Sequence, residues 1–279
     1  MLSYLRRNKV LLVGIFLLGF LAVFTIFGYL FWDVQMYRPL SAPANQSPTW
    51  DHPFGTDRQG RDLFAVIIAG TPLTLYIGVL AGAIGVTIGT VLALISAYYG
   101  GFWDTIIRGV VDVGLTIPAL LVLILIAVSI QGGLSVTMMA IVVASLSWLW
   151  PTRTIRSQVL SIKERAYVQV AKLSGTSGIG VIIKELLPNL LPYILATFVG
   201  STAAAILASV GLEVLGLGPM DSPTLGMTIY WVQFNAALLH GMWWWFLPPI
   251  IVIIMLFVGL FATSVGLDEL ANPRTRRAV

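Results

Sequence analysis

The order of apolar and polar positions divides the chain into long apolar stretches separated by shorter polar segments. A helix needs about 20 apolar residues to cross the hydrocarbon core of a bilayer, and each long stretch supplies roughly that number. The first stretch exceeds the apolar core of a signal peptide, which spans roughly 7–15 residues, so we expect an uncleaved span. The pattern predicts six transmembrane helices, over residues 10–32, 73–99, 106–130, 136–155, 190–215 and 248–266.

Composition supports the prediction of an all-α polytopic membrane protein. The chain has 58% hydrophobic and 10% charged residues, whereas soluble domains carry about 25% charged residues. It contains no cysteine, which excludes disulfides, thiolate metal sites and cysteine nucleophiles. The sequence has no basic patch interleaved with aromatic residues, so we expect no nucleic-acid partner.

Basic residues are distributed unequally between the two sides of the predicted membrane. If the N-terminus is cytoplasmic, only Arg38, Arg58 and Arg61 of the 16 lysines and arginines face outward. Cytoplasmic segments are enriched in Lys and Arg, so this distribution predicts a multi-pass protein of the cell membrane with both termini cytoplasmic. The predicted parts are a cytoplasmic N-terminus, a first span, an extracytoplasmic loop, a five-helix core and a cytoplasmic tail, over residues 1–9, 10–32, 33–72, 73–268 and 269–279.

The longest polar interruption in the second half of the chain, residues 161–189, carries the marks of two short helices. Ser161 and Glu164 form an S-x-x-E capping box, which predicts that a helix begins there. Gly175 stands where this helix would end, and Pro188 would close a second helix with apolar residues at helical spacing. Two short helices at a glycine-rich corner predict a rigid cytoplasmic knob, which could carry force to or from another protein. We call residues 161–189 the knob.

The knob carries a motif that identifies a family. Gln169, Val170 and Ala171, followed by Gly175 and then a Leu-Pro pair, resemble the EAA loop of ABC importer permeases. That pattern is Glu-Ala-Ala, three residues, Gly, then about ten residues before Leu-Pro. Gln169 replaces the glutamate and Val170 the first alanine, whereas the other positions and the spacing match.

Two further segments narrow the resemblance. Residues 52–62, HPFGTDRQGRD, match a segment typical of the second permease of dipeptide, oligopeptide and nickel importers. The ending GLDELANPRTRR resembles the ending of the same proteins, with Asn272 where aspartate is common. The resemblance covers nearly the whole chain.

The resemblance implies a type I ABC importer permease fold with a cytoplasmic coupling helix in the knob. It implies a homologous permease subunit as heterodimer partner, two ABC ATPase subunits that bind ATP and Mg, and an extracytoplasmic substrate-binding protein. The chain itself would hold no cofactor and no metal, and membrane lipid would surround it. The residues implied in coupling to the ATPases are Glu164, Ala166, Tyr167, Gln169, Val170, Ala171, Lys172, Ser174 and Gly175.

The resemblance favours peptides as substrates, with nickel chelates and oligosaccharides as alternatives. The chain has no P-loop, because no lysine follows a glycine, so ATP hydrolysis would reside on the partners. Neither an H-E-x-x-H motif nor paired intramembrane carboxylates indicate an enzyme, and no catalytic residue is expected. An ion-coupled carrier is the alternative from another class. Such carriers usually show internal repeats and charges near mid-membrane, whereas Asp112 and Glu213 lie near the predicted edges.

The fifth apolar stretch is rich in small residues, which a membrane helix needs where it packs tightly or lines a pathway. The positions that we expect along the translocation pathway are Ser201, Thr202, Ala205, Ser209 and Glu213. Two interpretations of Glu213 stay open. Its carboxylate reaches interfacial water, or it faces the pathway at the outer gate, where it would favour a cationic substrate group or pair with the partner permease.

Two local patterns concern packing. Gly78, Gly82, Gly85 and Gly89 fall on one helix face, which predicts close helix contact, although spans also tolerate glycine by chance. The run of three tryptophans at residues 243–245 predicts an aromatic belt at the interface, with sugar stacking as the alternative.

Two other patterns concern charge and backbone. Arg108 and Asp112 are spaced to pair on one helix, and Pro118 should kink that helix. His52 with nearby aspartates could hold a metal. The stronger interpretation is a turn scaffold, in which Asp57 and Asp62 bond backbone amides or pair with Arg58 and Arg61.

Overall fold

The structure is a computed structural model that describes residues 8–271. The predictions for the first cytoplasmic residues and for the Pro-Arg ending after Asn272 therefore lie outside the described residues. The helices are α2 (Lys9–Phe31), the 3-10 helix η1 (Val34–Tyr37), α3 (Leu63–Tyr99), α4 (Gly101–Thr116), α5 (Ala119–Ser129), α6 (Val136–Ser147), α7 (Leu149–Lys163), α8 (Ala166–Leu173), α9 (Gly178–Val181), the π turn η2 (Ile182–Leu186), α10 (Leu187–Val214), α11 (Leu225–Phe234) and α12 (Trp243–Ala271).

Four of these helical segments are long and apolar enough to cross a membrane: α2, α3, the continuous α9–η2–α10, and α12. The bent pair α4–α5 would make a fifth span, and α6 is a shorter apolar helix. The prediction of an all-helical, multi-pass membrane protein is confirmed. By helix length and apolarity the described chain has four or five spans.

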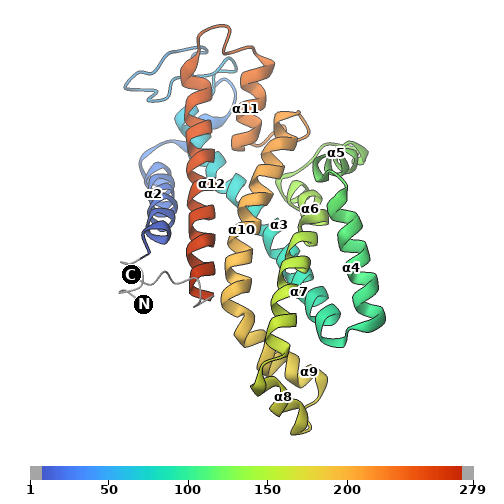
Figure 1. Cartoon of the computed structure of the whole chain (residues 1–279). Coiled ribbons are helices and arrows are strands. Elements are labelled where there is room, and N and C mark those ends of the chain that lie inside the picture. The colour runs from blue at the N-terminus through green and yellow to red at the C-terminus, as the bar shows by residue number, and fades with distance from the viewer. Residues whose placement is uncertain (1–7, 272–279) are drawn as a thin grey trace.

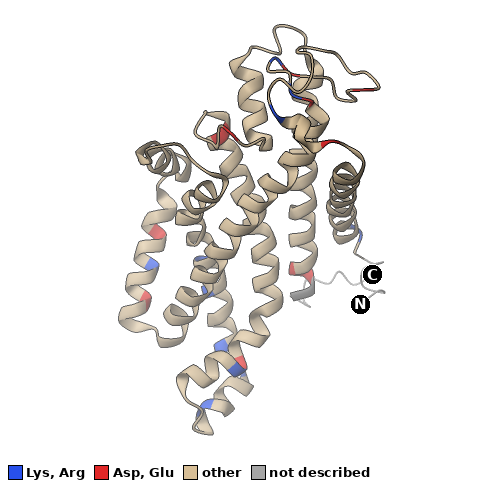
Figure 2. Cartoon of the chain, turned by 180° about the vertical axis from the view of Figure 1, so that it is seen from behind, with Lys and Arg blue, Asp and Glu red and all other residues tan. Residues whose placement is uncertain are grey.

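α3 and α10 run through the middle of the molecule, with α12 and α2 on one side and α6 and α7 on the other (Figure 1). α4 and α5 form the outer edge, the knob projects at one end, and α11 lies with the residue 33–62 loop at the other. Charged residues collect at the two ends and along α4, so the central helices between them are nearly free of charge (Figure 2).

The predicted close packing along the glycine face of α3 is confirmed. A Cβ atom built on Gly82 would lie 2.9 Å from Thr202 Oγ1 of α10, and one on Gly85 would lie 2.6 Å from Ser147 Cβ of α6. These separations leave no room for a side chain. α3 therefore meets α10 and α6 at backbone distance, as small residues allow in a membrane.

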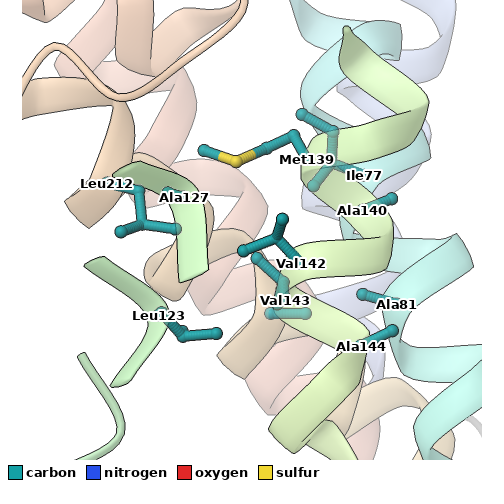
Figure 3. Packing of buried hydrophobic residues seen from close by; sticks show 11 residues of the cluster. Ile77, Ala81, Leu123, Ala127, Met139, Ala140, Val142, Val143, Ala144 and Leu212 are labelled. Atoms are coloured by element: carbon teal, nitrogen blue, oxygen red, sulfur yellow. The ribbon is translucent and has the colours of Figure 1, made fainter. Parts of the chain in front are cut away.

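Apolar side chains fill the space between α3, α5, α6 and α10. Met139 and Val142 of α6 are buried together with Ile77 of α3, Leu123 of α5 and Leu212 of α10 (Figure 3). α6 thereby joins the bent pair α4–α5 to the central helices.

α3 begins ten residues before the predicted second span, so the prediction that the loop extends to residue 72 is wrong. Asp62 caps the helix, because its Oδ1 accepts the amide of Ala65 at 2.7 Å. Residues 63–72 are apolar, and Pro72 lies within the helix. The 37 residues of α3 span roughly 55 Å, longer than a bilayer core of about 30 Å.

The predicted kink at Pro118 is confirmed, and it is large enough to divide the segment into two helices. α4 and α5 meet at 87°, because Ile117 before the proline takes an extended backbone. The predicted pairing of Arg108 with Asp112 is not what the structure forms. The ion pair of α4 joins Asp104 to Arg156 of α7, with Nε and Oδ1 2.6 Å apart.

The predicted start of the first knob helix at Ser161 and the predicted end of the second at Pro188 are wrong. Ser161 lies inside α7 and Glu164 is its C-cap, so the capping-box residues end a helix instead of starting one. α8 begins after Arg165, which makes no side-chain cap. Pro188 does not close the second helix, because the π turn η2 before it lets the helix continue as α10.

The last span begins at Trp243, five residues before its predicted start. The tryptophan run does not form a uniform belt. Trp245 is fully buried beside Leu63 and Val232, and Trp244 Nε1 donates to the carbonyl of Thr56 at 3.4 Å. Trp244 therefore fastens the residue 33–62 loop to α12, and Trp245 packs α12 against α3 and α11. Of the three rings, only Trp243 is largely exposed.

Candidate functional site

The knob is fastened to the bundle by its inner face. Val168 of α8 and Val181 of α9 are fully buried, and both belong to one apolar cluster with Ile155 and Val159 of α7. This cluster also takes in residues of α3 and α10, so α8 and α9 cannot shift without disturbing the core beneath them. The structure therefore supports a knob that moves with the helices to which it is attached.

The glycine corner of the knob is confirmed. Gly175 has φ of +79° and so takes the left-handed backbone that closes many helices. The amide of Thr176 donates to the carbonyl of Ala171 at 3.1 Å, which satisfies a carbonyl of the last turn of α8. Space around Gly175 is open, so conformation and not crowding requires glycine here.

The outer face of the knob exposes apolar side chains. Leu173 is 88% exposed, and Val170, Ile179 and Ile183 are more than half exposed. Tyr167 lies on α8 with Val170 and Leu173. Its partial burial raises the pKa of its phenol, so the hydroxyl stays a neutral hydrogen-bond donor. Large apolar groups gathered on a projecting element typically mark a docking surface.

The residues implied in coupling divide into two groups. Most are exposed: Glu164, Ala166, Tyr167, Val170, Lys172, Ser174 and Gly175. Gln169 and Ala171 are half-buried instead. The Gln169 amide Nε2 donates to the carbonyl of Lys163 at 3.1 Å, and Ala171 packs against the buried cluster. Gln169 therefore holds α8 to α7, and Ala171 holds α8 to the buried cluster.

The HPFGTDRQGRD segment forms the predicted turn scaffold. Asp57 accepts the backbone amides of Gln59 and Arg61 and pairs with the Arg61 side chain at 2.6 Å. His52 Nδ1 lies 2.6 Å from Asp62 Oδ2. Within residues 8–271 no group of three or more His, Cys, Asp and Glu residues is placed to hold a metal. The buried charges fix the loop over the outer end of α3.

An open cavity of about 870 Å³ lies between the α4–α5 bend and α6, α7, α10 and α12. Apolar side chains make up most of its wall, with hydroxyls such as those of Thr116, Thr154 and Ser264 among them. Its size is within the range of about 300–1,000 Å³ typical of small-molecule sites. Helices from both halves of the chain meet here, so the cavity is the candidate pathway surface.

The residues expected along the pathway are only partly brought together. Ser201 and Ala205 line the cavity. Thr202 packs against Gly82 of α3, and Ser209 is fully buried. Ser201, Ala205 and Ser209 stand four residues apart and so lie along one side of α10. The count of small residues alone could not show where along that side the cavity ends.

Glu213 has a role that the sequence did not reveal. Its side chain is fully buried, and Oε2 accepts the hydroxyl of Thr224 at 2.7 Å and the amide of Met227 at 3.1 Å. It thereby caps α11 and ties it to the end of α10. The side chain reaches neither interfacial water nor the cavity. Thr224, a hydroxyl residue before an apolar run, was the available signal for α11.

Apolar helices around an open cavity, with a projecting knob at one end, are features of a membrane permease component. Residues 85–277 match the family described as binding-protein-dependent transport system inner membrane component. The chain belongs to that family, and its function is that of a permease.

The relatives come from several bacteria. The dipeptide transport system permease protein DppC of Bacillus subtilis (strain 168) is 32% identical over 273 residues, which cover 98% of this chain and 84% of the relative. The oligopeptide transport system permease protein OppC of the same organism is 31% identical over 76% of this chain and 69% of the relative. A putative peptide permease protein of Brucella suis biovar 1 is 31% identical over 85% and 78%.

Proposed function

We propose that this chain is one of two transmembrane subunits of an ATP-driven importer that takes up peptides delivered by an extracytoplasmic binding protein. A homologous permease would complete the pathway. Two ABC ATPase subunits would bind ATP and Mg, and the chain itself would bind neither. Peptides are the favoured substrates because the relatives are named as dipeptide, oligopeptide and peptide permeases.

Six spans with both termini cytoplasmic are part of this proposal. The spans would be α2, α3, the bent pair α4–α5, α6 with α7, α9–η2–α10 and α12. The unequal distribution of basic residues supports the orientation with the knob inside. Because the chain has no cysteine, Ser177→Cys and Ser47→Cys test it directly: only the first should react with a cytoplasmic reagent and only the second with an external one.

The observation that carries the proposal is the two-sided knob. Its inner face is locked to α7 by Val168 and Val181, and its outer face presents Val170, Leu173 and Ile179 to solvent. A surface of this kind fits an apolar groove on one of the two ATPases, and a rigid attachment would convert movement of that ATPase into movement of the spans. The cavity between the spans would then form this subunit's half of the pathway.

A matched pair of substitutions tests the docking. Leu173 in the knob and Leu239 near the opposite end of the molecule are both 88% exposed, so a glutamate at either position should not disturb folding. In the assembled transporter, Leu173→Glu should lose co-purifying ATPase subunits and Leu239→Glu should retain them. Full retention of the ATPases by Leu173→Glu would overturn the docking surface.

Uptake identifies the substrate class. Vesicles that contain the two permeases and the ATPases, supplied with the binding protein and a radiolabelled dipeptide, should accumulate the label only with ATP. Uptake of a nickel chelate or an oligosaccharide in place of the dipeptide would reassign the substrate. Uptake driven by an ion gradient without ATP would favour a carrier instead.

A further inference from the structure

Asp104 and Arg156 form a bidentate ion pair between α4 and α7. Arg156 Nε lies 2.6 Å from Asp104 Oδ1, and Nη2 lies 2.7 Å from Oδ2. Both side chains are only about one-fifth exposed. A bidentate arginine–carboxylate pair fixes orientation as well as distance. The pair therefore sets how the first turns of α4 lie against α7.

α3 also contacts the Asp104–Arg156 pair, which we call the junction of α3, α4 and α7. The buried Ser96 hydroxyl donates to Asp104 Oδ1 at 2.5 Å and lies 3.1 Å from Arg156 Nε. At the next residue, the carbonyl of Ala97 accepts from Lys163 Nζ at 2.8 Å. α7 is thus joined to the end of α3 at two neighbouring positions and to α4 through Asp104.

The rest of α4 is weakly held. Val111 is the one buried residue among its 16, and the helix packs chiefly against α3 and α7. Farther along α4, Gly114 lies against the end of the Leu149 side chain of α7. The chain changes direction at both ends of α4, at the left-handed Gly100–Gly101 turn and at the 87° bend at Pro118.

α7 runs from this junction straight to the knob. Lys163 is its last residue, and its carbonyl accepts the Gln169 amide of α8. Val159 of α7 and Val168 of α8 share one buried cluster. Contacts are therefore continuous from the exposed face of the knob through α7 to Asp104, and the far end of α4 lines the cavity from Gly114 to the bend.

We propose that the Asp104–Arg156 pair is the contact through which displacement of the knob moves α4 at the cavity. Asp104 and Arg156 are positioning residues: they touch no substrate and act through α4. The inference rests on the proposed docking of the knob to an ATPase. It adds which residues carry movement from there to the pathway, and which helix moves.

The test measures radiolabelled dipeptide taken up per ATP hydrolysed by the assembled transporter in vesicles. Asp104→Ala and Arg156→Ala should keep their ATPase subunits and hydrolyse ATP, while uptake per ATP falls about tenfold. The exchanged pair, Asp104→Arg with Arg156→Asp, should recover severalfold over either single variant. Arg153→Ala is the control, because Arg153 is an exposed arginine one turn earlier on α7, and it should keep the parental ratio.

Two results would overturn the inference: a parental ratio in both alanine variants, or an exchanged pair no better than the single variants. If the alanine variants fail to assemble, Asp104→Asn keeps the size of the side chain and one hydrogen bond, and a parental ratio in that variant has the same meaning. Failure of the proposed function is a separate result, because the parent transporter itself would then show no ATP-dependent uptake.

Discussion

α3 and α4 adjoin one another at the Gly100–Gly101 turn, yet they are held in opposite ways. More than half of α3 is buried, and its glycines bring α10 and α6 to backbone distance along one face. α4 buries one residue, Val111, and its polar contacts with α3 and α7 gather at Asp104, which pairs with Arg156 and accepts the hydroxyl of Ser96. Helices packed at backbone distance resist movement, whereas a helix with few buried contacts and a turn at each end can change its orientation. The comparison indicates a fixed centre and a movable arm.

The largest effect should come from breaking the fixed centre. Gly85→Leu would force a side chain into Ser147, whose Cβ, carbonyl carbon and oxygen all lie within 2.8 Å of a Cβ at Gly85. Backbone atoms cannot move aside easily, so the free energy of unfolding should fall by about 3 kcal/mol, with loss of monodisperse protein. Thermal unfolding in detergent measures this change.

Gly109→Leu is the matched control on the movable arm. Gly109 lies within α4, and a Cβ built there meets nothing within 4 Å. The control should fold like the parent. Equal damage from both substitutions would remove the distinction between the two helices.

An intermediate effect is expected at the capped end of α3. Asp62→Ala removes the cap on Ala65 and leaves the buried His52 without its partner, so it should lower the free energy of unfolding by about 2 kcal/mol. Asp62→Asn retains an oxygen for the cap and should lose less. Chemical unfolding of the two variants side by side compares them, and equal losses would mean that the cap contributes little.

The smallest effect should follow from crowding the arm. Gly114→Ala places a Cβ 2.8 Å from Leu149 Cδ2, the flexible end of a side chain that can turn away. Its cost should stay below about 1 kcal/mol. A loss as large as that of Gly85→Leu, measured by the same thermal unfolding, would show that α4 is packed as rigidly as α3.

The sequence predicted the helical class and the close face of α3, because hydrophobic length and glycine spacing are local properties. The prediction failed where residues that often begin or end a helix lie inside one or at its opposite end. Pro188 is predicted to close a helix, although the structure places it inside a continuous helical segment. Ser161 and Glu164 match a capping box, but the helix that holds Ser161 had already begun at Leu149.

The candidate site was harder to predict because its contacts join distant segments. Spacing along one helix pointed to Arg108 and Asp112, whereas Asp104 pairs with Arg156, 52 residues away. Glu213 was expected at water or at the pathway, but it caps a helix that no periodicity had indicated. Periodicity reports the face on which a residue lies and does not report which element will cover that face.

Distances between spin labels in the assembled transporter test the contrast between centre and arm most directly. The chain has no cysteine, so spin labels can be attached to cysteines introduced in pairs. Suitable exposed positions are Val91 in α3, Leu207 in α10 and Val113 in α4. On addition of ATP and vanadate, the Val91–Val113 distance should shift by several ångströms while the Val91–Leu207 distance stays unchanged. A constant Val91–Val113 distance, or an equal shift of both distances, would contradict the account.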